Sequence, residues 1–156
     1  MKAGRRRARE FALQALYAVD TGNAHGPAAL SGLWGSLLDE LAEPVDEAVT
    51  AEETEFAQEI VRGVLEDREG LDRRIEAASE NWRLARMPVV DRNVLRLGAW
   101  ELVYRPDIPG SVAINEAIEL AKKFGGAESR AFVNGILDRI AKDVGRGGRR
   151  KNEGKN

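Results

Sequence analysis

The chain has 156 residues, 43% of them hydrophobic, which is enough to bury one core of ordinary domain size. It contains no cysteine and no long apolar run, so we expect no disulfide framework, thiolate site, signal peptide or membrane span, and we favour a reducing, cytoplasmic location. The formal net charge of −2 conceals two basic ends around an acidic region, because residues 1–9 carry +5, residues 39–80 carry −11 and residues 146–156 carry +4.

The first predicted helix, Lys2–Asp20, has a cationic half and an apolar half. Its apolar half repeats at helical spacing through Ala8, Ala12, Leu16 and Val19, which predicts a buried face. Arginine binds phosphate with two hydrogen bonds and stacks on bases, so the cationic half indicates an anionic partner such as nucleic acid. A solvated chain start is the alternative interpretation. The cations are Lys2, Arg5, Arg6, Arg7 and Arg9.

The next part of the chain predicts two more helices and the start of a fourth. Gly22 is expected to end the first helix in a left-handed conformation, and a second amphipathic helix is expected from about residue 28 to 41. Thr50 and Glu53 have the spacing of a capping box, in which each side chain bonds the other residue's backbone N–H. Gly70 is expected to break the third helix. A new apolar face then begins with Leu71, Ile75, Ala78 and Trp82.

The second half of the chain predicts three helices and no strand. A helix that begins at Pro88 and runs to about Tyr104 is apolar nearly all round, so it should be central, with Trp100 buried. Ser111 is a possible cap for a helix over 112–124, and a last helix is expected over about 128–144. We find no alternation of period two long enough for a strand, which predicts an all-α fold.

No arrangement of residues in the sequence predicts catalysis or a cofactor. His25 is the only histidine and has no nearby catalytic partner. Glu116 and Glu119 share a helix edge, but a metal site in a helical bundle also needs Glu-x-x-His pairs. Asn115 and Asn134 lie in apolar helices and are interpreted as buried amides that close helix–helix hydrogen bonds. We therefore expect no enzyme activity, no cofactor and no metal.

Three blocks of sequence, spread over about residues 5–140, carry a more specific signal. The first reads RRRARE followed by ALQALY, between Arg5 and Tyr17. The second, between Val90 and Leu102, contains VDR, VLR and EL. The third reads VAINEAIELAK, then FG, then FVNGILD, between Val112 and Asp138. In these blocks the chain resembles the NusB family of transcription antitermination factors.

The resemblance implies an all-α, NusB-like bundle of about seven helices in two small helical subdomains, about residues 5–69 and 70–144. These form one RNA-binding domain, 1–145, followed by a disordered basic tail, 146–156. The resemblance also implies binding to the boxA element of nascent ribosomal RNA as single-stranded RNA. It implies a heterodimer with NusE, a small-subunit ribosomal protein, and action on the elongating RNA polymerase complex with other Nus factors. It leaves open whether the protein also forms a homodimer.

The resemblance assigns roles to residues of this chain at matching positions. The arginine-rich start maps to RNA contacts, as do the loop before the last helix and an aromatic residue on that helix. Two further positions match residues that meet NusE. The expected RNA-binding residues are Lys2, Arg5, Arg6, Arg7, Arg9, Glu128 and Phe132, and the expected NusE-binding residues are Tyr17 and Asp91.

Two other functions remain as alternatives. One is a related NusB-like domain of the kind fused to RNA cytosine methyltransferases, although these proteins carry a long catalytic domain after it and this chain ends at residue 156. The other is a helical adaptor that binds only proteins. RNA binding would distinguish the adaptor from both the antitermination factor and the methyltransferase-related domain.

Overall fold

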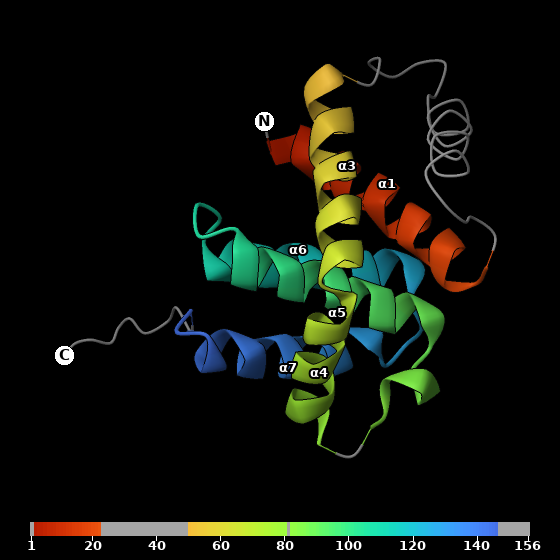
Figure 1. Cartoon of the computed structure of the whole chain (residues 1–156), viewed down its shortest axis with the longest axis vertical. Coiled ribbons are helices and arrows are strands. Elements are labelled where there is room, and N and C mark those ends of the chain that lie inside the picture. The colour runs from red at the N-terminus through yellow and green to blue at the C-terminus, as the bar shows by residue number, and fades with distance from the viewer. Residues whose placement is uncertain (1, 23–49, 81, 147–156) are drawn as a thin grey trace. The chain divides into compact units, whose positions relative to one another are not determined.

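A computed structural model describes residues 2–22, 50–80 and 82–146. Within these residues the chain is all-helical, with six α-helices, one 3₁₀ turn and no strand, as the sequence predicted. None of these helices is both long enough and apolar enough to cross a bilayer. Two compact units divide the chain, residues 1–62 and 63–156. The elements are α1 (Lys2–Asp20), α3 (Ala51–Glu66), α4 (Arg68–Ser79), η1 (Leu84–Arg86), α5 (Val89–Tyr104), α6 (Gly110–Phe124) and α7 (Ser129–Asp143) (Figure 1).

The first unit contains α1, which has the bounds and the buried face that the sequence predicted. Its last turn closes with a hydrogen bond from the Thr21 N–H to the Tyr17 carbonyl, 3.0 Å long. Gly22 follows with φ 84°, the left-handed conformation expected there. The predicted helix over 28–41 lies outside the described residues. The buried face of α1 consists of Ala8, Phe11, Ala12, Leu13, Ala15 and Leu16.

The start of α3 confirms the predicted capping box. The Glu53 N–H donates to Thr50 Oγ1 at 3.0 Å, and the Thr50 N–H donates to Glu53 Oε1 at 2.8 Å. These two bonds satisfy backbone donors that a helix start otherwise leaves unpaired. The first turn of α3 is therefore fixed by a local sequence signal.

The prediction that Gly70 separates two helices is wrong, because α3 gives way to α4 at Asp67. Gly70 lies in the first turn of α4, where an added Cβ would meet Asp67 Oδ1 at 2.3 Å. The glycine thus makes room for the Asp67 carboxylate. The expected apolar face continues only to Ala78, since α4 ends at Ser79 and Trp82 is 49% exposed.

The second unit is built around α5, as its nearly uniform apolar character predicted. Helices α5, α6 and α7 pack against one another in all three pairings, and α4 packs against α5 and α7 (Figure 1). Pro88 directly precedes α5, and Trp100 is only 5% exposed, so both predictions are confirmed. Because α5 has neighbours on several sides, it buries residues from Asp91 to Leu102 on most of its surface.

Two predictions for α6 and α7 are wrong. Pro109, not Ser111, occupies the cap of α6, and Ser111 lies inside the first turn. The Pro109 carbonyl accepts hydrogen bonds of 3.0 Å from the Val112 and Ala113 N–H groups, and no side chain caps this helix start. Asn115 and Asn134 are not buried, so they are not the core amides that their apolar neighbours suggested.

Candidate RNA and protein interface

The arginines of α1 differ in how far the protein itself already occupies them. The Arg7 guanidinium holds the Glu53 carboxylate with two hydrogen bonds, 3.2 Å from Nε to Oε2 and 2.9 Å from Nη2 to Oε1. The Glu53 side chain is 8% exposed and that of Arg7 is 24% exposed. Arg7 therefore presents only part of its guanidinium to solvent.

Phe56, one turn further along α3, lies beneath two more arginines. The guanidinium carbon of Arg5 lies 4.8 Å from the centre of the Phe56 ring, and that of Arg9 lies 5.5 Å from it. Arg9 is only 3% exposed, whereas Arg6 is exposed and Arg5 is half-buried. The sequence expectation treated the four arginines as equivalent RNA contacts, but their exposure differs: Arg6 is exposed, Arg5 and Arg7 are half-buried, and Arg9 is buried.

The Glu53 carboxylate is held in its charged form. Burial is the largest single influence and raises the pKa of Glu53. The hydrogen bonds from Arg7 and from the Thr50 N–H, together with the Arg7 charge, lower this pKa by more than burial raises it. The net effect is a pKa below the usual value for glutamate. The Glu53 carboxylate thus remains an anionic partner for Arg7 at neutral pH. The distance of 2.9 Å between Arg7 Nη2 and Glu53 Oε1 is one that a guanidinium also adopts with a phosphate oxygen.

The remaining expected residues of the first unit lie on α1. Tyr17, the expected NusE contact, is 41% exposed, one turn before the end of the helix. Lys2 is the first residue of the helix. Tyr17 therefore presents a large part of its side chain to solvent.

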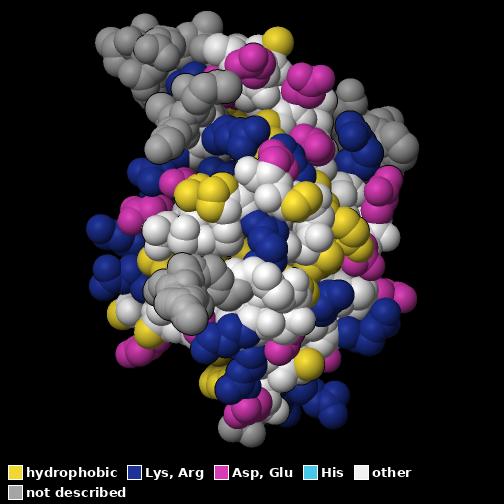
Figure 2. All heavy atoms as spheres, turned by 90° about the vertical axis from the view of Figure 1, so that its left-hand side faces the viewer, with side chains coloured by type: hydrophobic (Ala, Val, Ile, Leu, Met, Phe, Trp, Pro, Cys, Tyr) yellow, Lys and Arg dark blue, Asp and Glu magenta, His cyan; other side chains and the backbone are white. Residues whose placement is uncertain are grey.

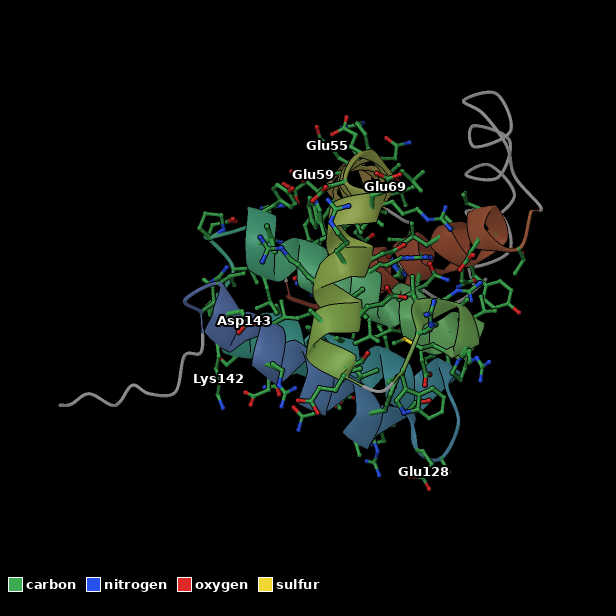
Figure 3. The ribbon with its side chains drawn as sticks, turned by 60° about the horizontal axis from the view of Figure 1, so that its bottom comes forward. Glu55, Glu59, Glu69, Glu128, Lys142 and Asp143 are labelled. Carbon is green, nitrogen blue, oxygen red and sulfur yellow. The ribbon has the colours of Figure 1, made fainter. Side chains whose placement is uncertain are left out.

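In the second unit, Phe132 lies half-buried in the first turn of α7 and contacts Trp82 edge-to-face. The two ring centres are 5.9 Å apart and the ring planes meet at 75°. Glu128, in the loop before α7, is exposed, and its side chain points away from the helices (Figure 3). The structure thus brings Trp82, which the sequence placed on a buried face, to an expected RNA residue.

Asp91 lies in the first turn of α5 and is 4% exposed, although the resemblance implied a protein contact there. Its Oδ1 accepts a hydrogen bond of 2.6 Å from Ser129 Oγ, which in turn accepts one of 2.9 Å from the Gly126 N–H. Ser129 is itself 3% exposed. The Asp91 carboxylate therefore fastens the loop before α7 to the start of α5 and does not face solvent.

Other polar contacts of the second unit were not foreseen from the sequence. Arg96, 4% exposed, donates to both oxygens of Asp72, at 2.8 and 3.1 Å, and to Asn93 Oδ1 at 3.0 Å. Arg146, expected to begin a disordered tail, donates to the carbonyls of Leu102, at 2.7 Å, and Ile108. The remainder of that tail, 147–156, lies outside the described residues. No local sequence pattern predicts the hydrogen bonds to Asp72, Leu102 and Ile108, because each bond joins residues more than twenty positions apart.

The charged side chains do not suggest a metal centre. In the described part of the chain, no three His, Cys, Asp or Glu side chains are grouped closely enough to hold a metal ion. The face shown in Figure 2 intersperses Lys and Arg with Asp and Glu. The interface features that remain are the arginines of α1, Tyr17, and the aromatic pair of the second unit.

Comparison with known proteins places the chain in one family. The NusB family profile matches residues 6–142. The transcription antitermination protein NusB of Geotalea daltonii is 50% identical over 142 residues, which cover 91% of this chain and 97% of that protein. The protein of the same name from Myxococcus xanthus is 53% identical over 137 residues, which cover 88% of this chain and 94% of that protein.

Solved structures agree in fold with this chain. T. maritima NusB superposes with a TM-score of 0.75 and 40% identity, and the match covers 89% of this chain and 91% of that one. A structure of the antitermination factors NusB and NusE in complex with dsRNA gives a TM-score of 0.77 at 26% identity, covering 92% and 99%. Because the family profile spans nearly all of the folded sequence and relatives share about half of their residues with it, this chain belongs to the NusB family.

Proposed function

We propose that this NusB-family protein is a transcription antitermination factor that binds a boxA-type, single-stranded RNA together with NusE and acts on elongating RNA polymerase in ribosomal RNA synthesis. The observation that carries the proposal is the family match over residues 6–142, to which curated antitermination proteins also belong. A similar protein has been solved with NusE and RNA, which supports both partners. The protein would work in the cytoplasm and without enzyme activity, cofactor or metal.

The RNA would lie first on the cationic half of α1. Arg6 is the most exposed of the four arginines, and it would supply phosphate contacts together with Arg5 and Lys2. Arg7 would bind a phosphate only where the phosphate displaces the Glu53 carboxylate or shares the Arg7 guanidinium with it. Arg9 is buried against the Phe56 ring, so it would stabilise the packing of α1 against α3 and would not contact RNA directly.

In the second unit, Phe132 would offer a ring for a base to stack on, with Glu128 at the edge of the site. Stacking on aromatic side chains is how proteins commonly hold unpaired bases. For NusE, the exposed Tyr17 supports a direct contact. Asp91 would act on that partner through the loop that it fastens, because its own carboxylate is buried and bonded to Ser129.

A salt titration tests the RNA part of the proposal. Affinity for a boxA-type RNA and for a scrambled RNA is measured between low and moderate salt, with and without NusE. Each phosphate contact contributes about −0.7 to the slope of log K against log salt for single strands. We expect a steep slope for the whole chain, a shallower one after residues 1–9 are deleted, and a higher boxA affinity when NusE is present.

A control variant separates the site from general charge. Lys122→Ala removes one exposed cation from the last turn of α6 and should leave the slope unchanged. If deletion of residues 1–9 changes neither affinity nor slope, the cationic half of α1 is a solvated chain start. A pull-down from lysate is carried out with and without RNase. NusE that is retained after RNase treatment, with no RNA bound when RNase is withheld, would favour the protein-only adaptor. The mass of the purified protein decides the homodimer.

A further inference from the structure

We infer that Trp82 and Phe132 together form a stacking site for an unpaired RNA base, an inference that rests on the proposed RNA binding. Nothing in the sequence pattern assigns this role to Trp82, because its spacing from Leu71, Ile75 and Ala78 predicts a core residue. In the structure it is instead 49% exposed and lies against the ring of Phe132.

The edge-to-face geometry of the pair leaves most of its ring faces uncovered by the partner ring. In an edge-to-face contact, one ring directs its edge at the other, so the partner covers only one of the four broad ring faces. The interplanar angle of 75° and the centre-to-centre distance of 5.9 Å place this pair in that class. A base can therefore stack on one ring while its edge meets the other.

The backbone that carries Trp82 is held in place from two sides. Ser79 Oγ donates to the Trp82 carbonyl at 2.7 Å, and the Leu84 N–H donates to Glu76 Oε2 at 2.8 Å. Leu84 is itself buried. An exposed indole on such a fixed segment loses little freedom when a base stacks on it.

A second brace comes from α7, the helix that carries Phe132. Arg139, two turns along, donates to the Ala78 carbonyl at 3.2 Å and pairs with Glu80. Glu80 has φ 63°, a conformation that residues other than glycine rarely adopt. The pairing with Arg139 thus joins α7, which carries Phe132, to the end of α4, two residues before Trp82.

The charges beside the pair favour a nucleic acid over an apolar protein segment. Arg83 follows Trp82 directly, and Arg130 lies two residues before Phe132; both are exposed. Within the described residues, neither of these two side chains makes an ion pair or a hydrogen bond. The acids nearby in sequence are engaged elsewhere, since Glu80 pairs with Arg139 and Glu76 accepts a hydrogen bond from the Leu84 N–H. Two exposed guanidinium groups close in sequence to the rings suit the phosphates of a strand whose base is stacked there.

The test uses the full chain and a labelled boxA-type RNA, with Trp82→Ala, Trp82→Phe and Tyr104→Ala. Tyr104 is a matched control, because it is 48% exposed and bonds Asp67 at the opposite end of α4 from Trp82. Removing a stacked ring weakens binding by roughly 5- to 150-fold, by the usual range for one base. We expect that loss for Trp82→Ala, little loss for Trp82→Phe, none for Tyr104→Ala, and the same salt slope in all four proteins.

An abasic oligomer of the same length and charge is the second probe. Trp82→Ala should bind it as tightly as the unaltered chain does, because no base is present to stack. An equal loss on both probes would overturn the inference, and so would unchanged boxA affinity in Trp82→Ala while the unaltered chain binds. If Trp82→Ala loses only NusE, the ring is a protein contact and the stacking site is also overturned. Failure of the unaltered chain to bind any RNA would instead remove the proposed function.

A spectroscopic measurement covers the case in which Trp82→Ala does not fold. The unaltered protein is labelled with 5-fluorotryptophan, and the Trp82 signal is assigned by comparison with Trp82→Phe. The boxA-type RNA should shift this ¹⁹F resonance and the abasic oligomer should not. A Trp82 signal that does not respond to bound RNA would overturn the inference.

Discussion

Arg7 of α1 and Glu53 of α3 form a two-bonded ion pair, with N–O distances of 2.9 and 3.2 Å, which engages one of the arginines expected to bind RNA. Glu53 therefore occupies the same fork of N–H groups that a phosphate would use. The carboxylate also closes the capping box with Thr50, so one acidic side chain links helix initiation to the availability of an arginine. An RNA phosphate that binds Arg7 has to compete with this carboxylate.

We predict that Glu53→Gln strengthens RNA binding and steepens the salt slope by about 0.7, because it releases one guanidinium to the phosphates. Glutamine can still complete the capping box, so the helix start is kept. The lost charged hydrogen bonds should lower the free energy of unfolding by about 1.5–3 kcal/mol. The measurements are the RNA salt titration and urea unfolding. Thr50→Ala, which removes the cap and keeps the Arg7–Glu53 pair, should cost about 1 kcal/mol and leave RNA affinity unchanged.

The same carboxylate should make stability depend on pH at the acidic end. The pKa of Glu53 is lower in the folded protein than the ordinary glutamate value of 4.5, so its contribution is fully present above that value. It is lost as pH falls below 4.5 and through the lower folded-state pKa. Urea unfolding at a series of pH values should show this loss in the unaltered chain and a smaller one in Glu53→Gln. An identical acid profile in both proteins would contradict the assignment.

Arg6→Ala and Arg9→Ala should behave differently although both remove one arginine from α1. Arg6 is exposed, so its loss should flatten the salt slope by about 0.7 and leave the unfolding midpoint unchanged. Arg9 is 3% exposed and lies over Phe56, so its loss should destabilise the protein by about 1–2 kcal/mol with little effect on the slope. Equal slopes in the two variants would show that burial does not divide the cluster.

Gly63→Ala should destabilise the second unit, although alanine normally stabilises a helix relative to glycine by about 1 kcal/mol. An added Cβ at Gly63 would lie 2.1 Å from Trp100 Nε1, so the indole has to move. Trp100→Ala, which removes a side chain only 5% exposed, should cost about 3–5 kcal/mol. Thermal unfolding checks both. Gly135→Ala is the control, because an added Cβ there meets nothing within 4 Å and α7 should gain stability.

Ser129→Ala should lower stability by about 1–3 kcal/mol, because it leaves the buried Asp91 carboxylate without the hydroxyl that donates to it at 2.6 Å. Asp91→Arg should unfold the second unit, since it would bury an unpaired cation among these groups. Circular dichroism and urea unfolding measure both effects. A folded Asp91→Arg protein that lacks only NusE binding would restore the direct contact that the family resemblance implied.

Local sequence patterns alone were sufficient to predict much of the secondary structure of this protein. Several features depend on neighbours within about one helical turn: the bounds of α1, the left-handed Gly22, the Thr50–Glu53 capping box and the start of α5 directly after Pro88. The all-α class and the family followed from helical periodicity and from sequence blocks. Such features are readable from sequence because the interacting groups lie close together along the chain.

The tertiary structure alone decided which of the expected residues are exposed. Sequence spacing could not place Trp82 outside the core, bury Asp91 beside Ser129, or pair Arg7 with Glu53, since these contacts join residues 38 to 50 positions apart. Charge and residue type identify groups able to contact a partner, whereas exposure depends on what the rest of the chain packs around them. A cation or an aromatic ring therefore acquires its role only when folding determines whether another part of the protein already occupies it.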